Sequence, residues 1–244
     1  MLELKNICFS AETEDGNEKQ ILKDVNLKID DGFVVITGPN GGGKSTLAKI
    51  IAGIITPTSG QILLDGKDIT NLSITERANQ GISFAFQQPV RFKGITVYDL
   101  ISLAAGEEID ITKACGYLSQ VGLCARDYIN REVNASLSGG ELKRIEIATV
   151  LARSTKVSIF DEPEAGIDLW SFNSLIKVFE KMHNTLGGSI IIISHQERIL
   201  NIADKVVVIA NGSVKDEGKK DDILPSLLHA ADAACKVLTD ALEV

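Results

Sequence analysis

The chain has 244 residues, of which 44% are hydrophobic and 24% are charged, and its formal net charge is −8. This composition is typical of a globular protein, and the length suits one large domain or two small ones. The acidic balance argues against a nucleic-acid or anionic-membrane partner, since either would favour a basic surface. The sequence shows neither an apolar run long enough to span a membrane nor, at Met1–Lys5, the apolar core of a signal peptide. We therefore expect a cytoplasmic chain, without direct membrane insertion, whose membrane contacts would go through a partner.

The first ninety residues contain several short, partly alternating apolar runs, which predict strands. These runs are Leu2–Phe9, Ile21–Ile29, Phe33–Thr37, Gln61–Leu64 and Ile82–Phe86. Helical spacing follows the third run at Thr46–Gly53 and returns at Ser73–Gln80. In the second helix Ser73 and Glu76 are spaced as a capping box.

Strand signals disappear from about Val90 to Thr149, and helical spacing replaces them. The predicted helices are Thr96–Ala105, Ile111–Val121 and Ser138–Ala152. Beyond them we expect strands at Val157–Phe160, Ser189–Ile193 and Lys205–Ile209, a helix at Leu169–Leu186, a hairpin turn at Asn211-Gly212 and a helical tail over Asp221–Val244. We therefore predict one domain, with an α/β core from residues 1–88 and 153–220, a helical subdomain over 89–152 and a tail over 221–244.

A phosphate-binding loop is predicted between the third strand and its helix. The loop has the pattern in which a glycine, four free positions and a second glycine precede Lys-Ser. Its glycines let backbone N–H groups surround a phosphate, and the following helix N-terminus adds partial positive charge. Lys44 would reach the β- and γ-phosphates, and Ser45 would bind Mg²⁺. The candidate nucleotide-binding residues here are Gly38, Pro39, Asn40, Gly41, Gly42, Gly43, Lys44, Ser45 and Thr46.

Two carboxylates, Asp161 and Glu162, follow the mostly apolar Val157–Phe160 run. By itself this pattern is more often a plain turn at a strand end. In a protein with a phosphate-binding loop, the first acid suits Mg²⁺ and the second can polarise an attacking water. His195 follows the Ser189–Ile193 strand, whose end we expect to face the same crevice.

A second anion site is predicted where the Ser138 helix begins. Ser138 and Glu141 are spaced as a capping box, which is also the purely structural interpretation. The amides of Gly139 and Gly140 leave this helix N-terminus open to a phosphate. We expect Lys143 and Arg144, one turn further on, to form a solvated helix face that could help attract phosphate.

Taken together, these motifs resemble those of the ATP-binding cassette (ABC) ATPases over nearly the whole chain. Their counterparts here are Gly38–Thr46 for Walker A, Gln87 for the Q-loop, Leu137–Glu141 for the signature, Val157–Glu162 for Walker B, Ala165–Asp168 for the D-loop and His195 for the switch histidine. The resemblance implies an α/β fold with a mainly parallel sheet, an N-terminal antiparallel β-subdomain and an inserted α-helical subdomain.

The resemblance also implies a mechanism with ATP and Mg²⁺. Two copies would form a transient, ATP-dependent homodimer, head to tail, with ATP between Walker A of one copy and Ser138, Gly139, Gly140 and Glu141 of the other. Glu162 would activate water and His195 would contact the γ-phosphate. Gln87 would bind Mg²⁺ together with Ser45 and Asp161. One departure concerns the aromatic residue that usually stacks on adenine, for which Phe9 is the sole nearby candidate.

The stretch Gly81–Val90 is similar to that of the SufC-like ATPases of the Suf iron–sulfur cluster assembly system. This similarity implies soluble Suf-type scaffold partners that dock near Gln87–Leu100. Two features depart from that family: Glu164–Asp168 lacks its serine, and the signature begins with Leu137. The alternative is the ATP-binding subunit of a membrane transporter, with transmembrane permease subunits as partners. A nucleic-acid-associated ABC protein or a non-hydrolysing module fits less well, because the chain has one acidic cassette and a full set of hydrolytic candidates.

Overall fold

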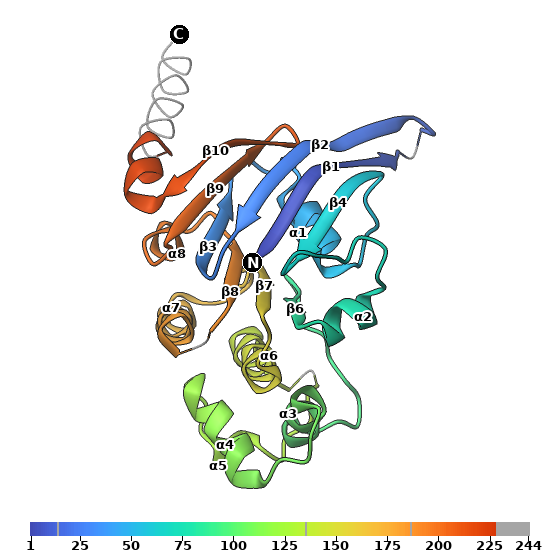
Figure 1. Cartoon of the computed structure of the whole chain (residues 1–244). Helices are drawn as coiled ribbons and strands as arrows, with labels where there is room; N and C mark the ends of the chain where they lie inside the picture. The colour runs from blue at the N-terminus through green and yellow to red at the C-terminus, as the bar shows by residue number, and fades with distance from the viewer. Residues whose placement is uncertain (14, 135, 186, 228–244) are drawn as a thin grey trace.

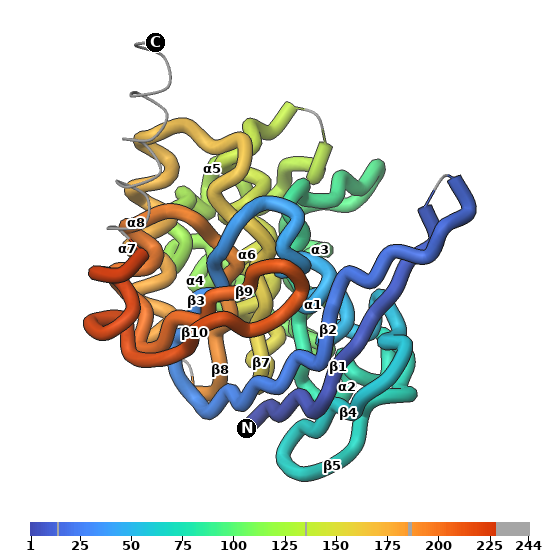
Figure 2. Tube along the Cα trace, turned by 90° about the horizontal axis from the view of Figure 1, so that it is seen from above, coloured from blue at the N-terminus to red at the C-terminus, as the bar shows by residue number. Residues whose placement is uncertain are grey.

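The computed structural model describes residues 1–13, 15–134, 136–185 and 187–227. A four-stranded antiparallel sheet has the order β2-β1-β4-β5. Its strands are β1 (Leu2–Glu12), β2 (Glu18–Ile29), β4 (Ser59–Leu64) and β5 (Lys67–Asp68). Seen from above in Figure 2, the β1–β2 hairpin extends outward as an arm.

A six-stranded sheet forms the centre of the molecule, in the order β10-β9-β3-β8-β7-β6. Strands β9 and β10 pair antiparallel, whereas the other neighbours pair in parallel. The carboxyl ends of β3, β8, β7 and β6 therefore meet at one edge, where ligands bind in open α/β sheets. The six strands are β3 (Gly32–Thr37), β6 (Ile82–Ala85), β7 (Val157–Asp161), β8 (Ser189–Ile193), β9 (Lys205–Ala210) and β10 (Ser213–Lys219).

Helices cover both faces of this sheet. Figure 1 shows α6 and α7 below the sheet, with α3, α4 and α5 beyond α6. The helices are α1 (Lys44–Ala52), α2 (Ile74–Asn79), α3 (Val97–Ala105), α4 (Ile111–Gln120), α5 (Ala125–Tyr128), α6 (Gly139–Arg153), α7 (Leu169–Thr185) and α8 (Glu197–Leu200). None of the helices in the described ranges has the length and hydropathy that a membrane span requires.

The alternation of side chains along the buried strands divides the apolar interior into two cores. In β3, Phe33 and Val35 pack into the core that includes α3, α4, α6 and α7. Val34 and Ile36 face the other way, into the core that includes α1 and the antiparallel sheet. Because both faces are covered, these strands consist of continuous apolar runs.

The predicted fold class is confirmed, with the parallel sheet, the antiparallel β-subdomain and the helical insertion in their expected places. Four elements were not expected: the short strand β5, helices α5 and α8, and the charged edge strand β10. The strand predicted to end at Phe86 ends at Ala85, so Phe86 belongs to the following loop. Of the predicted tail, residues 221–227 are helical and the rest lies outside the described residues.

Candidate functional site

The loop between β3 and α1 needs its glycines for steric reasons. Gly38 and Gly43 have φ angles of 130° and 103°, which side chains of other residues rarely tolerate. A Cβ atom on Gly38 would lie 2.0 Å from the Ile209 carbonyl oxygen, and one on Gly43 would lie 2.6 Å from Leu22 Cδ2. The backbone therefore turns tightly against its neighbours and leads its N–H groups into the start of α1.

Lys44 is held inside this loop. Its Nζ donates hydrogen bonds to the carbonyl oxygens of Gly38 (2.8 Å) and Pro39 (2.9 Å). Burial lowers the pKa of Lys44, while the negative charges of Glu162 and Asp161 oppose that effect. The loop thus presents a single, well-fixed ammonium group beside the backbone amides that can bind phosphate.

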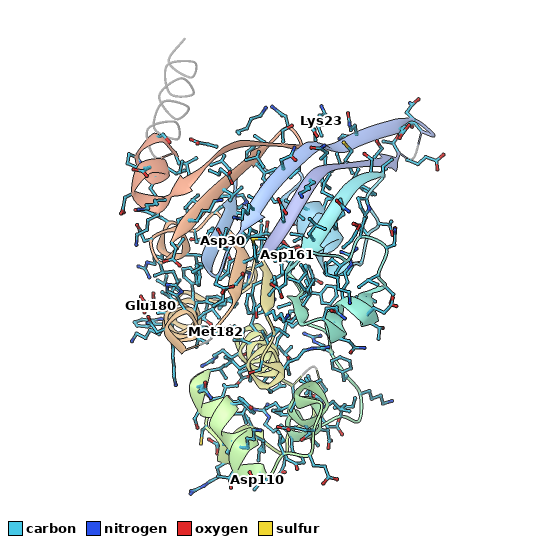
Figure 3. All side chains as sticks on the ribbon, in the orientation of Figure 1. Lys23, Asp30, Asp110, Asp161, Glu180 and Met182 are labelled. Atoms are coloured by element: carbon cyan, nitrogen blue, oxygen red, sulfur yellow. The ribbon has the colours of Figure 1, made fainter. Side chains whose placement is uncertain are left out.

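Ser45 and Asp161 are brought together from α1 and the end of β7. The Ser45 hydroxyl donates to Asp161 Oδ1 at 2.8 Å. Asp161 is 4% exposed and lies inside the molecule (Figure 3). Burial raises its pKa, although the hydrogen bond from Ser45 acts in the opposite direction. A hydroxyl and a buried carboxylate oxygen at this distance are hard oxygen ligands of the kind that Mg²⁺ prefers, so the donor set fits that ion.

Glu162, Gln87 and His195 form a second group, drawn from the ends of β7, β6 and β8. Gln87 Nε2 donates to Glu162 Oε2 at 2.5 Å, and His195 Nε2 lies 3.9 Å from Glu162 Oε1. The Glu162 backbone has a φ of 44°, and its N–H donates to the Ile193 carbonyl. Such left-handed backbone at a non-glycine residue is costly and concentrates at functional sites.

The imidazole of His195 is 39% exposed and lies near Lys44. Burial lowers the pKa of His195, the charge of Lys44 lowers it further, and Glu162 opposes both. Burial and Lys44 thus favour the neutral ring, in which one nitrogen can donate and the other can accept a hydrogen bond.

A cavity of about 860 Å³ opens over the loop. Its lining combines expected residues with several that sequence analysis missed: Lys19, Gln20, Ile21, Lys23, Asn211 and Gly212. These come from β2 and the β9–β10 turn, and the Asn-Gly pair was the only signal for them. None of the described lining residues is phenylalanine, tyrosine or tryptophan, and Phe9 packs instead against the core that includes α1. Phe9, the candidate for adenine stacking, is thus not among the residues that line this cavity.

The predicted capping box at α6 is present. Ser138 accepts from the Glu141 N–H, and Glu141 accepts from the Ser138 N–H at 2.7 Å. Glu141 also accepts a hydrogen bond from the Tyr128 hydroxyl of α5, a contact that sequence analysis missed. Among the described residues, the lining of the large cavity includes none of Ser138–Glu141. The second predicted phosphate site therefore does not line this cavity.

The expectation that Lys143 belongs to a solvated helix face is wrong. Lys143 is 1% exposed, and its ammonium group pairs with Glu146 at 2.9 Å. Arg144 is half-buried and donates to the Gly140 carbonyl at 3.2 Å. The reason is that α6 passes under the sheet with apolar residues on most sides, so even its polar positions face protein.

Comparison with known proteins agrees with this arrangement. Residues 22–165 match the family model of the ABC transporter. The uncharacterized ABC transporter ATP-binding protein MJ0035 of Methanocaldococcus jannaschii is 40% identical over 84% of this chain and 85% of that protein. The spermidine/putrescine import ATP-binding protein PotA of Mesoplasma florum is 34% identical over 91% of this chain and 63% of its own length. A dimeric, post-hydrolysis structure of the ATP-binding cassette MJ0796 bound to ADP and Pi is 25% identical, with a TM-score of 0.80 over 90% of this chain and 99% of that one.

Proposed function

The chain belongs to the ABC transporter family, and on that premise we propose that it is the ATP-binding and ATP-hydrolysing subunit of a membrane transporter. It is an ATPase of this family. One observation supports this assignment of the catalytic site. Five polar side chains meet at the carboxyl edge of four parallel strands: Ser45, Asp161, Gln87, Glu162 and His195. Hydrolysis of a nucleoside triphosphate needs a phosphate cradle, a metal site and a base, and this edge offers all three.

The loop residues Gly38–Thr46 would bind the phosphates, with Lys44 as the cation for their negative charge. Ser45, Asp161 and Gln87 would hold Mg²⁺, which supplies positive charge to the phosphate oxygens when it is bound. Adenine would pack against Ile21 and the aliphatic parts of Lys19 and Lys23 in place of the missing aromatic ring. These three residues line the same cavity as the phosphate-binding loop.

Glu162 would act as the general base that orients and polarises the attacking water. Its carboxylate lies between the Gln87 amide and the His195 ring. His195, in the neutral form that its lowered pKa favours, would donate a hydrogen bond to the γ-phosphate. Gln87 would keep its Nε2 on Glu162 while its Oε1 binds Mg²⁺, because one amide has both a donor and an acceptor.

The second phosphate site, formed by Ser138, Gly139, Gly140 and Glu141, would act in a second copy of the chain. Its separation from the large cavity supports this proposal, as does the dimeric state of the MJ0796 cassette. Two head-to-tail copies would each complete the nucleotide site of the other. We propose that residues 89–152 move as a subdomain when ATP closes this dimer and when hydrolysis opens it.

The partner would dock beside the Q-loop, near Gln87–Leu100. A cavity of about 220 Å³ lies next to this stretch, at Phe86, between α2, β6, α3 and α6, and its lining is mostly apolar. Ile74 and Phe86 at this cavity are 48% and 38% exposed, as suits a contact that a transmembrane subunit covers. The names of the relatives favour such a subunit over a Suf-type scaffold. The scaffold stays a second candidate on the Gly81–Val90 stretch alone.

The identity of the partner distinguishes the transporter function from the cluster-assembly function. We expect affinity purification from detergent-solubilised source cells to recover a polytopic membrane protein, and Ile74→Glu to prevent its recovery while ATP binding is kept. Ile111→Glu is the matched control, because Ile111 is also exposed, at 55%, but lies away from this cavity. Recovery of a soluble scaffold pair instead would favour cluster assembly and contradict the transporter function.

A further inference from the structure

Lys143 and Glu146 form a buried ion pair on α6, five and eight residues beyond Ser138. The side chain of Lys143 is 2% exposed and that of Glu146 is 15% exposed, and their charged atoms lie 2.9 Å apart. A buried ion pair is weak evidence for stability, since desolvation of both charges costs about as much as their attraction returns. Its presence therefore calls for another explanation.

The Lys143–Glu146 pair binds the backbone of Phe86. Glu146 Oε1 accepts a hydrogen bond from the backbone N–H of Phe86 at 3.0 Å. Lys143 Nζ donates to the backbone carbonyl of the same residue. Both polar groups of Phe86 are thus bound by one ion pair, and the Glu146 carboxylate bridges the two donors. We call this arrangement of Lys143, Glu146 and the Phe86 backbone the Phe86 clamp.

The clamp lies one residue before Gln87. Strand β6 ends at Ala85, so the sheet no longer fixes the backbone at Phe86. Gln87 itself is exposed, yet its side chain reaches Glu162 at 2.5 Å. A side chain that is not packed depends on its backbone for position, and here that backbone is fixed from α6 rather than from the sheet.

We propose that Lys143 and Glu146 are positioning residues for hydrolysis, which set the place of Gln87 against Glu162 and tie it to the helix that carries the signature. A contiguous line of contacts runs from α6 through the Phe86 backbone to Gln87 and then to Glu162. When α6 moves with the phosphate bound at its N-terminus, the clamp moves Phe86, and Gln87 moves with it. Burial raises the pKa of Glu146, which the charge of Lys143 opposes; the pair therefore depends on both members.

This inference rests on the proposed function, because it needs Gln87 and Glu162 in the hydrolytic site. The test variant is Lys143→Met with Glu146→Leu, which replaces the ion pair by apolar residues of similar size. Such replacements of buried pairs are often neutral or stabilising. The matched control is Lys113→Met with Glu107→Leu, which removes an exposed pair at 2.6 Å in the same helical group.

We expect the Lys143/Glu146 variant to keep its Tm and to bind ATP within about twofold of wild type, while its kcat falls at least about tenfold. The control should keep its kcat. In a Gln87→Ala background the same pair of substitutions should lower kcat no further, because both changes act through one side chain. A structural effect alone would add in that background and would lower Tm.

The clamp would be overturned if the Lys143/Glu146 variant kept a kcat within about twofold of wild type. It would also be overturned if the two substitutions lowered kcat by the same factor in the Gln87→Ala background as in wild type. If the double variant does not fold, Lys143→Met alone decides by the same comparison, since it removes the hydrogen bond to the Phe86 carbonyl. Glu162→Gln, measured in parallel, separates the two claims. Normal hydrolysis by Glu162→Gln would contradict the proposed site itself, whereas its inactivity beside an active pair variant would contradict only the clamp.

Discussion

Among single residues, Asp161 shows most directly how function costs stability. Its carboxylate is nearly inaccessible and its pKa is raised by burial above the ordinary 3.8. Keeping it ionised at neutral pH is therefore unfavourable in the nucleotide-free fold. We expect Asp161→Asn to remove this cost, because the amide oxygen can still accept the hydrogen bond from Ser45.

The Asp161→Asn variant should accordingly have a higher Tm than wild type at pH 7.5, by about 2–4 °C, the shift that roughly 1 kcal/mol produces in a chain of this size. The same variant should lose the stabilisation that wild type gains from ATP with Mg²⁺. The sign of the pH dependence follows from the raised pKa. The difference is full above the folded-state pKa, shrinks as pH falls towards 3.8, and is absent below it. A lower Tm for Asp161→Asn at pH 7.5 would contradict this account.

Much of the candidate site could be predicted from the sequence, because Lys44, Ser45, Asp161 and Glu162 belong to short motifs of neighbouring residues. Prediction failed at Lys143 and Tyr128, whose roles depend on contacts with other elements. Lys143 contacts Phe86, which lies 57 residues away in the sequence. A pattern of neighbouring residues cannot predict a contact over that separation. A signal was nevertheless present: α6 has apolar residues on most sides, and such a helix is buried all round.

Among the secondary-structure elements, strand β10 could not be predicted from the sequence. The Asn211-Gly212 turn was predicted, but Ser213–Lys219 is mostly polar and charged and lacks a strand signal. It is an edge strand, and charges on an edge keep other chains from pairing with it. The buried strands were easy to predict for the opposite reason, since both of their faces are covered.

Helix α6 allows stability and function to be separated with a matched pair of variants. Ser138 caps α6 and Ser73 caps α2, each with a complete capping box. Ser138→Ala and Ser73→Ala should each cost about 1 kcal/mol of stability, the usual effect of losing such a cap. Only Ser138→Ala should also lose ATPase activity, because only that helix start is proposed to contact ATP.

Thermal melts and steady-state hydrolysis measured on both variants check this prediction. Equal losses of activity in the two variants would show that the effect of Ser138→Ala comes through stability. Full activity of Ser138→Ala would remove Ser138 from the nucleotide site.

The whole molecule is half of a catalytic unit in the account proposed here. The large cavity contains Lys44, Glu162 and His195, but among the described residues its lining includes none of the signature. Sequence motifs predicted both halves and the fold that carries them. They could not show that Gln87 contacts Glu162 within one chain, because that contact joins two strand ends 75 residues apart.

The most direct test of this account is the mass of Glu162→Gln in solution, measured by light scattering after size exclusion, with and without ATP and Mg²⁺. The variant should bind ATP without hydrolysing it and should therefore keep the closed dimer. We predict the 26.2 kDa of one chain without nucleotide and twice that mass with ATP. Adding Lys44→Ala should restore the single-chain mass, because the phosphates lose their cation. A Glu162→Gln variant that binds ATP and keeps the mass of one chain would contradict the shared site.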